Sequence, residues 1–432
     1  MTVDVFKTIL REFYDEPLVD GVVARDIDIP LDTDMVLSVI GCRRAGKTTL
    51  LKQLVKQLVE EGVDKRQIVF VNFEDERIDR RKESFDELLL AHAELYSDID
   101  AGDCWYFFDE VQEMPDWEKF VRRLHEHKSK HVVVTGSNAR FLSREIASSL
   151  RGRTISYEVF PFSFREYVQY AGFDPSKQHT TKDKAMLRKL FDSFLHQGGF
   201  PETINQVPSV RNKILRSYLD VMMYRDLIER YAVRNHEALK AFIVKRLANI
   251  GKEFSVHKTY LELKSAGFEV SKDFLYAAND WCEEIYLLFS LRQYHESTVK
   301  QQTRIRKNYA IDNGLVGNTS FRASEDIGRF LENAVFLDLR RNGKEVFFLK
   351  EGKECDFIVR INGKVELAIQ VCKSIMDSDT RIREIEGLIQ GVKRTGAAKA
   401  VIITLDEEDI FEEQGVVVHV QPALKWFLQK EK

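Results

Sequence analysis

Short unbroken runs of hydrophobic residues dominate the first 160 residues of the chain. MVLSVI (35–40), IVFVNF (68–73), CWYFF (104–108) and HVVVTG (131–136) contain few polar positions, and TTLLKQLVKQLVEEG (48–62) has apolar residues at helical spacing. Strands that are buried on both faces have such runs, which are typical of parallel sheets covered by helices. The pattern therefore predicts an α/β fold with a parallel sheet.

The pattern becomes helical from 208 to 250, and two further helices follow on either side of a turn at Gly267. A strand comes next, and TRIRKNYAIDN (303–313) can pair back onto it. Two helices followed by a hairpin are the outline of a winged helix. We therefore predict a helical and winged-helix-like region in the middle of the chain.

After residue 321 the pattern gives a helix, three strands, a long helix and a further strand. The paired glycines and the proline of LHQGGFPETIN (195–205) are typical of a boundary between domains. We predict three domains, which comprise residues 1–195, 196–320 and 321–432.

Composition narrows the class of protein. Hydrophobic residues at 44% and charged residues at 31% describe a globular protein, and a net charge of −4 argues against a bulk electrostatic attraction to nucleic acid. No apolar run reaches the ~18 residues that a membrane helix needs, and the acidic, amphipathic N-terminus is unlike a secretory signal. Five cysteines without CxxC spacing fit reduced thiols. We expect a cytoplasmic protein without a membrane partner.

The first candidate site is the stretch 41–48, which matches GxxxxGK[ST] in full between a predicted strand and a predicted helix. Its glycines let the loop turn N–H groups toward phosphates, and the next helix presents its positive end to the same anion. Lys47 would reach the β- and γ-phosphates, and the Thr48 hydroxyl would ligate Mg²⁺. The predicted cofactors are ATP and Mg²⁺. The predicted binding residues are Gly41, Cys42, Arg43, Arg44, Ala45, Gly46, Lys47, Thr48 and Thr49.

Polar residues after two later strands complete this candidate site. Asp109 would hold Mg²⁺, and Glu110 would polarise the attacking water as a general base. Asn138 could orient that water or touch the γ-phosphate, although a simple turn explains it equally well. Arg153, in preference to Arg151, could stabilise charge on the γ-phosphate in its own chain or in a neighbouring subunit of a homo-oligomer. A surface salt bridge explains either arginine equally well.

These motifs, taken in order, resemble those of a known family. GCRRAGKTTLL, FFDEVQEMPDWEKFVRRL, VVVTGSNARFLSREIASSLRGR and FPFSFREY resemble prokaryotic ATPases in which an AAA-like P-loop domain precedes a C-terminal domain of unknown function. GGFPETI (198–204), YRDLIERY (224–231) and RKNYAIDNGL (306–315) also agree, so the resemblance spans nearly the whole chain. It implies ATP binding and hydrolysis on a P-loop NTPase fold of the additional-strand, catalytic-glutamate type, and it names no substrate.

Basic residues gather in the predicted hairpin at 292–309. They are Arg292, Lys300, Arg304, Arg306 and Lys307, opposed only by Glu296. The helix at 271–285, in the recognition position of a winged helix, is instead acidic and is a poor surface for a phosphate backbone. DNA contact through the hairpin, a solvated hairpin and a protein-binding module all remain open, and we expect an unidentified protein partner.

The helix and strand order after 321 resembles the core of PD-(D/E)xK nucleases. Such enzymes need a metal-binding Asp, then an acid and a lysine two residues apart that face the same metal-bound water. Asp356 and Glu332 match the first requirement, but Val371 stands two residues before Lys373. Gln370 stands three before it and would face the opposite side unless a β-bulge intervened. We predict an inactive, degenerate site of Glu332, Asp356, Gln370 and Lys373.

The leading hypothesis is an ATPase whose nucleotide state moves the winged-helix-like and nuclease-like modules against a partner. One alternative is a nucleotide-dependent binding or scaffold protein with incidental hydrolysis. Another is an ATP-regulated, metal-dependent nuclease.

Overall fold

The computed structural model describes residues 2–137, 150, 152–175, 177, 180–297, 299, 301, 305–319 and 327–429. The chain divides into two compact units, an N-terminal unit of Met1–Phe160 and a C-terminal unit of Pro161–Lys432. The C-terminal unit holds both segments that the sequence assigns to separate domains, and the three-domain division stays a prediction. Within the described ranges, no helix has the length and apolar character needed to cross a membrane.

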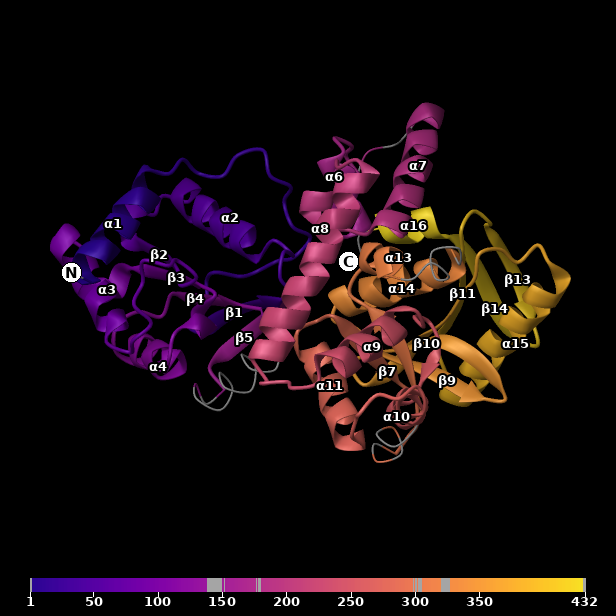
Figure 1. The fold of residues 1–432 in the computed structure, drawn as a ribbon. Helices are drawn as coiled ribbons and strands as arrows, with labels where there is room; N and C mark the ends of the chain where they lie inside the picture. The colour runs from indigo at the N-terminus through magenta and orange to yellow at the C-terminus, as the bar shows by residue number, and fades with distance from the viewer. Residues whose placement is uncertain are drawn as a thin grey trace. The chain divides into compact units, whose positions relative to one another are not determined.

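The N-terminal unit is built on a parallel sheet in the strand order β2-β3-β4-β1-β5 (Figure 1). Its strands are β1 (Val36–Gly41), β2 (Ile68–Asn72), β3 (Trp105–Asp109), β4 (Val132–Gly136) and β5 (Thr154–Val159). Strand β4 lies between β1 and β3 and is the additional strand of the predicted fold. The α/β P-loop NTPase fold is therefore confirmed.

Helices cover this sheet and exclude water from it. They are α1 (Thr2–Asp15), α2 (Lys47–Glu60), α3 (Ser84–Leu95) and α4 (Trp117–His127). Every residue of β1 and β4 is buried, which is why their sequences lack alternation. Aromatic rings fill the layer between helices and sheet: Phe13 stacks on Phe70, and Phe85 stacks on Phe120 with centroids 4.1 Å apart.

The C-terminal unit begins with helices. They are α6 (Phe164–Tyr170), α7 (Thr181–Gln197) and α8 (Pro208–Val221), and α8 continues into a π-helical stretch at Met222–Glu229. Next come α9 (His236–Leu247), β6 (Glu253–Phe254), α10 (Val256–Ser265), α11 (Lys272–Glu284), β7 (Leu288–Arg292) and β8 (Arg306–Ala310). The three strands form an antiparallel sheet in the order β6-β8-β7.

The fully buried Arg246 joins these helices to the small sheet. Its guanidinium donates hydrogen bonds to Asn308 Oδ1 at 2.8 Å and Asn279 Oδ1 at 2.9 Å. It also lies over the Phe254 ring, with 4.7 Å between the guanidinium carbon and the ring centroid. Because a buried guanidinium needs most of its five donors satisfied, this side chain fixes α9, α11 and β8 relative to one another.

The rest of the C-terminal unit surrounds a six-stranded mixed sheet in the order β13-β14-β12-β11-β10-β9. The strands are β9 (Glu345–Glu351), β10 (Lys353–Ile361), β11 (Lys364–Val371), β12 (Lys399–Thr404), β13 (Asp409–Glu413) and β14 (Val416–Pro422). The helices are α13 (Asn313–Thr319), α14 (Ile327–Arg341), α15 (Ser378–Thr395) and α16 (Ala423–Leu428). Strands β9, β10 and β11 are antiparallel, whereas β11, β12 and β14 are parallel. The order helix, three strands, helix, strand is present, and β13 and β14 extend it.

Candidate functional site

The loop at 41–46 leaves the carboxyl end of β1 and turns into α2. Gly46, directly before α2, has a φ of 93°, which is in the left-handed region that favours glycine. This turn lets the free N–H groups at the start of α2 face the loop. A Cβ at Gly41 would lie 2.1 Å from the carbonyl oxygen of Val159 in β5. Position 41 therefore requires glycine because β5 passes too close for a side chain. This reason adds to the turn of the loop that the sequence predicted.

Lys47 is the first residue of α2, and its side chain is buried in the loop. Its Nζ donates to the carbonyl oxygens of Gly41 at 3.3 Å and Cys42 at 3.2 Å, and it lies 3.2 Å from Glu110 Oε1. The loop therefore combines a buried ammonium with a helix N-terminus, and both attract a phosphate anion.

Asp109 ends β3 and receives hydroxyl donors from two sides. Thr48 Oγ1 donates to its Oδ2 at 2.7 Å, and Thr135 Oγ1 donates to its Oδ1 at 2.5 Å. Burial raises the pKa of Asp109, although the hydrogen bonds from Thr135 and Thr48 oppose this shift. The Thr48 hydroxyl and the Asp109 carboxylate are oxygen donors of the kind that Mg²⁺ prefers, so the residues present fit that ion.

Glu110 follows β3 directly, with a left-handed φ of 50°. Its N–H donates to Thr135 Oγ1 at 2.9 Å, and its Oε2 accepts from Gln112 at 2.6 Å. Burial acts to raise the pKa of Glu110, but the charge of Lys47 and the hydrogen bond from Gln112 outweigh burial and lower it. The carboxylate is thus ionised near neutral pH, as a general base must be.

Three further residues of this site were not predicted from the sequence. Thr135 bridges Asp109 and Glu110, Glu74 accepts from Arg43 at 2.9 Å, and Arg25 donates to the carbonyl oxygens of Ala45 and Phe160, each at 2.7 Å. A signal for Thr135 was available, because a hydroxyl at the carboxyl end of a buried parallel strand meets the neighbouring strand end. Arg25 lies outside any helix or strand and carries no such signal.

Arg153 lies at the opposite edge of the same sheet. The Val36 N–H donates to the Arg153 carbonyl at the start of β1, so the length of β1, about 16 Å, separates this residue from the loop. Its exposed guanidinium pairs with Glu126 at 3.0 Å. This corrects the prediction of a role in its own chain, while a role across a subunit interface stays a prediction. Asn138 and Arg151 lie outside the described residues.

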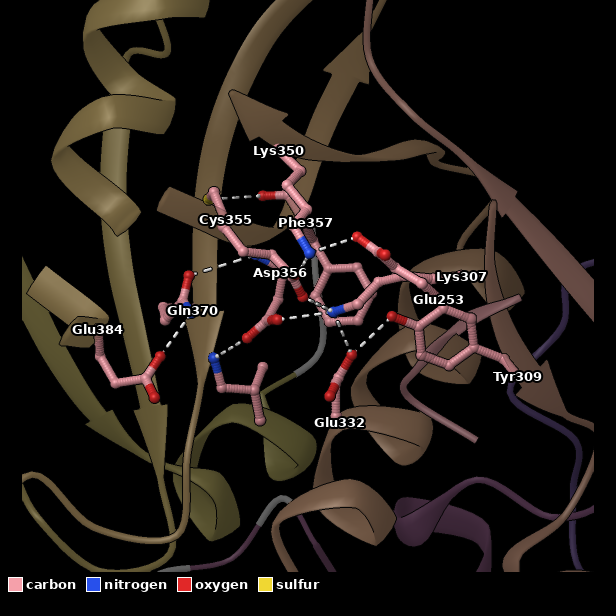
Figure 2. A network of polar contacts seen from close by, with 12 residues as sticks. Glu253, Lys307, Tyr309, Glu332, Lys350, Cys355, Asp356, Phe357, Gln370 and Glu384 are labelled. Atoms are coloured by element: carbon pink, nitrogen blue, oxygen red, sulfur yellow. Dashed lines mark hydrogen bonds and ion pairs between the residues drawn. The ribbon is translucent and has the colours of Figure 1, made fainter. Parts of the chain in front are cut away.

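Glu332 and Asp356 come together in the C-terminal unit with Lys307 between them (Figure 2). The Lys307 Nζ lies 2.8 Å from Glu332 Oε1, 2.8 Å from Asp356 Oδ1 and 2.7 Å from Glu354 Oε1. Lys307 is buried on the inner face of β8. The assignment of Lys307 to the basic surface of the hairpin is therefore wrong.

The other basic residues of the hairpin have different surroundings. Arg292 is exposed at the end of β7, and Arg306 is half-buried at the start of β8. Lys300 and Arg304 lie outside the described residues. The described part of the hairpin therefore carries less surface charge than its sequence indicates.

Gln370 meets this cluster at the backbone N–H of Asp356, and Lys373 lies away from it. Gln370 Oε1 accepts from the Asp356 N–H at 3.2 Å, and its Nε2 donates to Glu384 Oε2 at 2.5 Å. Lys373 is exposed beyond the end of β11. The pairing of β11 with β12 keeps its register from Leu367 to Val371, so Gln370 is turned toward α15 while Lys373 faces solvent.

Comparisons with known proteins agree with the architecture of the N-terminal unit. The family model of an AAA domain matches residues 33–168, and a model of a domain of unknown function matches residues 188–325. An uncharacterized protein of Methanocaldococcus jannaschii is 32% identical over 423 residues, which cover 94% of this chain and 91% of that protein. The chain belongs to the same family as this protein. An uncharacterized protein of Haemophilus influenzae is 28% identical over 348 residues, or 80% of this chain and 84% of that protein.

Solved structures show weaker likenesses. The Walker-type ATPase of Pyrococcus abyssi has a TM-score of 0.44 at 14% identity and covers 67% of this chain and 91% of its own. The Orc1 protein of Aeropyrum pernix, solved in complex with DNA, has a TM-score of 0.28 at 12% identity and covers 78% of this chain and 93% of its own. The AAA-like part of the predicted family is confirmed, and the nuclease-like character of the C-terminal segment stays a prediction.

Proposed function

We propose that the N-terminal unit binds ATP at the loop 41–48 and hydrolyses it with the help of Mg²⁺. The observation that carries this proposal is the meeting of three groups at the carboxyl ends of β1 and β3. They are the Lys47 ammonium, the Thr48–Asp109 pair and the ionised Glu110. Membership in an AAA-domain family supports the same assignment.

Each of these groups has a distinct role in the proposed reaction. Lys47 and the N–H groups of the loop would hold the β- and γ-phosphates, while Thr48 and Asp109 would hold Mg²⁺. When bound, Mg²⁺ would neutralise charge on the phosphate oxygens. Glu110 would accept a proton from the attacking water, and its position after β3 is fixed by Thr135 and Gln112.

The test is a comparison of the wild-type chain with the Lys47→Ala and Glu110→Gln variants. We expect Lys47→Ala to lose binding of a non-hydrolysable ATP analogue and to lose phosphate release. Glu110→Gln should bind the analogue normally, with kcat lower on the order of 10²-fold or more, because only the base is lost. Phosphate release at the wild-type rate by either variant would contradict its assigned role.

We propose further that nucleotide state controls the C-terminal modules and their contact with a partner. The order α9-β6-α10-α11-β7-β8 and the sheet order β6-β8-β7 support a winged-helix-like module. Its α11 carries the exposed acidic residues Asp273, Asp280 and part-exposed Glu284. These acids favour a protein partner over DNA.

Binding to DNA, RNA and candidate proteins can be measured together with ATPase rate and molecular mass. For a protein partner, we expect neither nucleic acid to change the rate or to bind in low salt. DNA binding that weakens in Arg292→Glu would instead favour contact through the hairpin. A Glu110→Gln chain with full biological activity would favour a scaffold with incidental hydrolysis.

A further inference from the structure

Three carboxylates of the C-terminal unit surround the ammonium of Lys307. Glu332 comes from α14, Glu354 and Asp356 come from β10, and the ammonium comes from β8. Figure 2 shows Lys307 pointing toward Glu332 and Asp356. The ammonium donates hydrogen bonds to Glu332 and Asp356 and forms an ion pair with Glu354, and the three carboxylate oxygens lie 2.7 to 2.8 Å from Nζ. Three carboxylates from two elements therefore surround the ammonium.

Other groups also contact these carboxylates. Asp356 Oδ2 accepts from the Val371 N–H at 2.9 Å, and Glu332 Oε1 accepts a second bond from Tyr309 at 2.7 Å. Lys350 Nζ lies 3.5 Å from Glu354 Oε2. A Cβ at Gly251 would lie only 2.9 Å from Glu332 Oε2, so backbone closes that side.

A divalent metal does not fit this arrangement. It would need oxygen ligands at 2.0 to 2.6 Å, the distances usual for Mg²⁺ and Ca²⁺, at the place where the ammonium already lies. As arranged, no group of three or more His, Cys, Asp or Glu side chains in the described ranges could hold a metal ion. The metal site implied by a nuclease-like fold is thus closed by the side chain of Lys307.

The electrostatics of the cluster keep this lysine charged. Burial acts to lower the pKa of Lys307, but the charges of Asp356 and Glu332 outweigh burial and raise it well above its usual value. A buried charge is stable only when it is paired in this way.

We propose that Lys307 is the resident cation of the carboxylate cluster of Glu332, Glu354 and Asp356. Its ammonium takes the position of a divalent metal, excludes metal from the site and locks β8 to α14 and β10. The proposal rests on contacts within the C-terminal unit and is independent of ATP hydrolysis. It also gives a second reason, besides the missing acid before Lys373, for the predicted lack of nuclease activity.

The test replaces Lys307 with methionine, which keeps the length of the side chain and removes its charge. Full-length wild type and Lys307→Met are compared for Mn²⁺ binding and unfolding midpoint, in chelator and in excess Mn²⁺, without nucleotide. We expect wild type to bind no Mn²⁺ at the cluster and to keep one midpoint in both solutions. Lys307→Met should unfold at a lower temperature in chelator, bind one Mn²⁺ per chain and recover part of the lost midpoint.

Two further variants make the result specific to the cluster. Adding Asp356→Asn to Lys307→Met should abolish the Mn²⁺ gain. Lys353→Met removes an exposed lysine of β10 that pairs with Glu386 outside the cluster, and it should behave like wild type.

Two results would overturn the proposal. One is Mn²⁺ binding by wild type that Asp356→Asn removes, and the other is a folded Lys307→Met chain without Mn²⁺ binding. If Lys307→Met does not fold, wild type and Asp356→Asn decide the matter: equal absence of binding supports a closed site, and a difference between them contradicts it.

Discussion

Thr135 shows how a single hydroxyl ties both carboxylates of the nucleotide site together. It donates to Asp109 and accepts from the Glu110 N–H. The valine side chain has the same shape without the hydroxyl, so Thr135→Val removes both contacts and little else. Loss of a hydrogen bond to a charged group costs about 1.5–3 kcal/mol, so we expect kcat to fall about 10- to 100-fold.

The measurement is ATPase rate as a function of Mg²⁺ concentration, with binding of an ATP analogue as a control for folding. Thr135→Ser keeps the hydroxyl and should keep most of the rate. Wild-type kcat and Mg²⁺ dependence in Thr135→Val would show that Thr135 does not position the carboxylates.

Asp312 performs a comparable task in the core of the C-terminal unit. It is fully buried and accepts the N–H groups of Gly199 at 2.7 Å, Gly314 at 2.8 Å and Leu315 at 3.3 Å. In Asp312→Ala these amides lose their acceptor, and we expect the free energy of unfolding to fall by about 3 kcal/mol. Urea unfolding measures this loss. The exposed Asp192→Ala is the control, and equal stability of the two variants would refute the prediction.

At the scale of elements, α15 rests directly on the backbone of β10. A Cβ at Gly387 would lie 2.1 Å from the Glu354 carbonyl oxygen. Gly387→Ala should therefore push α15 away from the sheet and lower the free energy of unfolding by about 1–3 kcal/mol, the usual cost of overpacking. Ile382→Ala, on the exposed side of the same helix, should change stability far less. A Gly387→Ala protein as stable as wild type would mean that the helix and strand can separate at no cost.

Element packing also explains why Lys307 was wrongly predicted to lie on the basic surface of the hairpin. Lys307 and Tyr309 stand two residues apart on β8 and so point to the same face. That face meets α14 and β10, where Glu332 and Asp356 hold the lysine. The two-residue spacing of Lys307 and Tyr309 was visible in the sequence, but the elements that cover this face were not.

For the whole molecule, we expect the two units to respond to pH in opposite directions. Burial raises the pKa of Asp312 and Glu332 to about 7, from ordinary values of 3.8 and 4.5. A carboxyl with a raised pKa in the folded state stabilises most below its unfolded value, and this contribution is lost as pH rises through 7. The C-terminal unit should therefore lose stability between about pH 5 and 7, by up to about 1.4 kcal/mol per pH unit for each group.

In the N-terminal unit three histidines act in the reverse direction, and they outnumber the Asp109 carboxyl, whose pKa burial raises. Burial lowers the pKa of His92, His125 and His131 below 6.5. A histidine with a lowered pKa stabilises the folded state above its unfolded value, and this contribution is lost as pH falls. The N-terminal unit should therefore gain stability as pH rises through 6.5.

Calorimetry across this range can separate the two responses, because ATP raises only the transition of the unit that binds it. Between about pH 5 and 7 we expect the midpoint temperature of the ATP-sensitive transition to rise and that of the other transition to fall. Glu332→Gln should weaken the pH dependence of the midpoint temperature of the C-terminal unit, whereas the exposed Glu412→Gln on β13 should leave it unchanged. Parallel movement of both transitions would contradict the prediction.

The sequence by itself determined the elements and the chemistry that lies within a few residues. The unbroken apolar runs specified strands buried on both faces, and the spacing of Gly41, Gly46 and Lys47 specified the loop that ends the first of them. Asp109 and Glu110 were predictable for the same reason. Strand burial and loop geometry depend on residues that are close together along the chain, so the local sequence pattern is enough to predict them.

Only the tertiary structure decided which distant residues meet. Sheet order brought Thr135 beside Asp109 and left Arg153 at the far edge from the loop. Packing of β8 against β10 put Lys307 where the sequence implied a metal, and no spacing rule links residues 307, 332 and 356. Such contacts depend on how separate elements close around one core, and their free energy arises only after water has left that space.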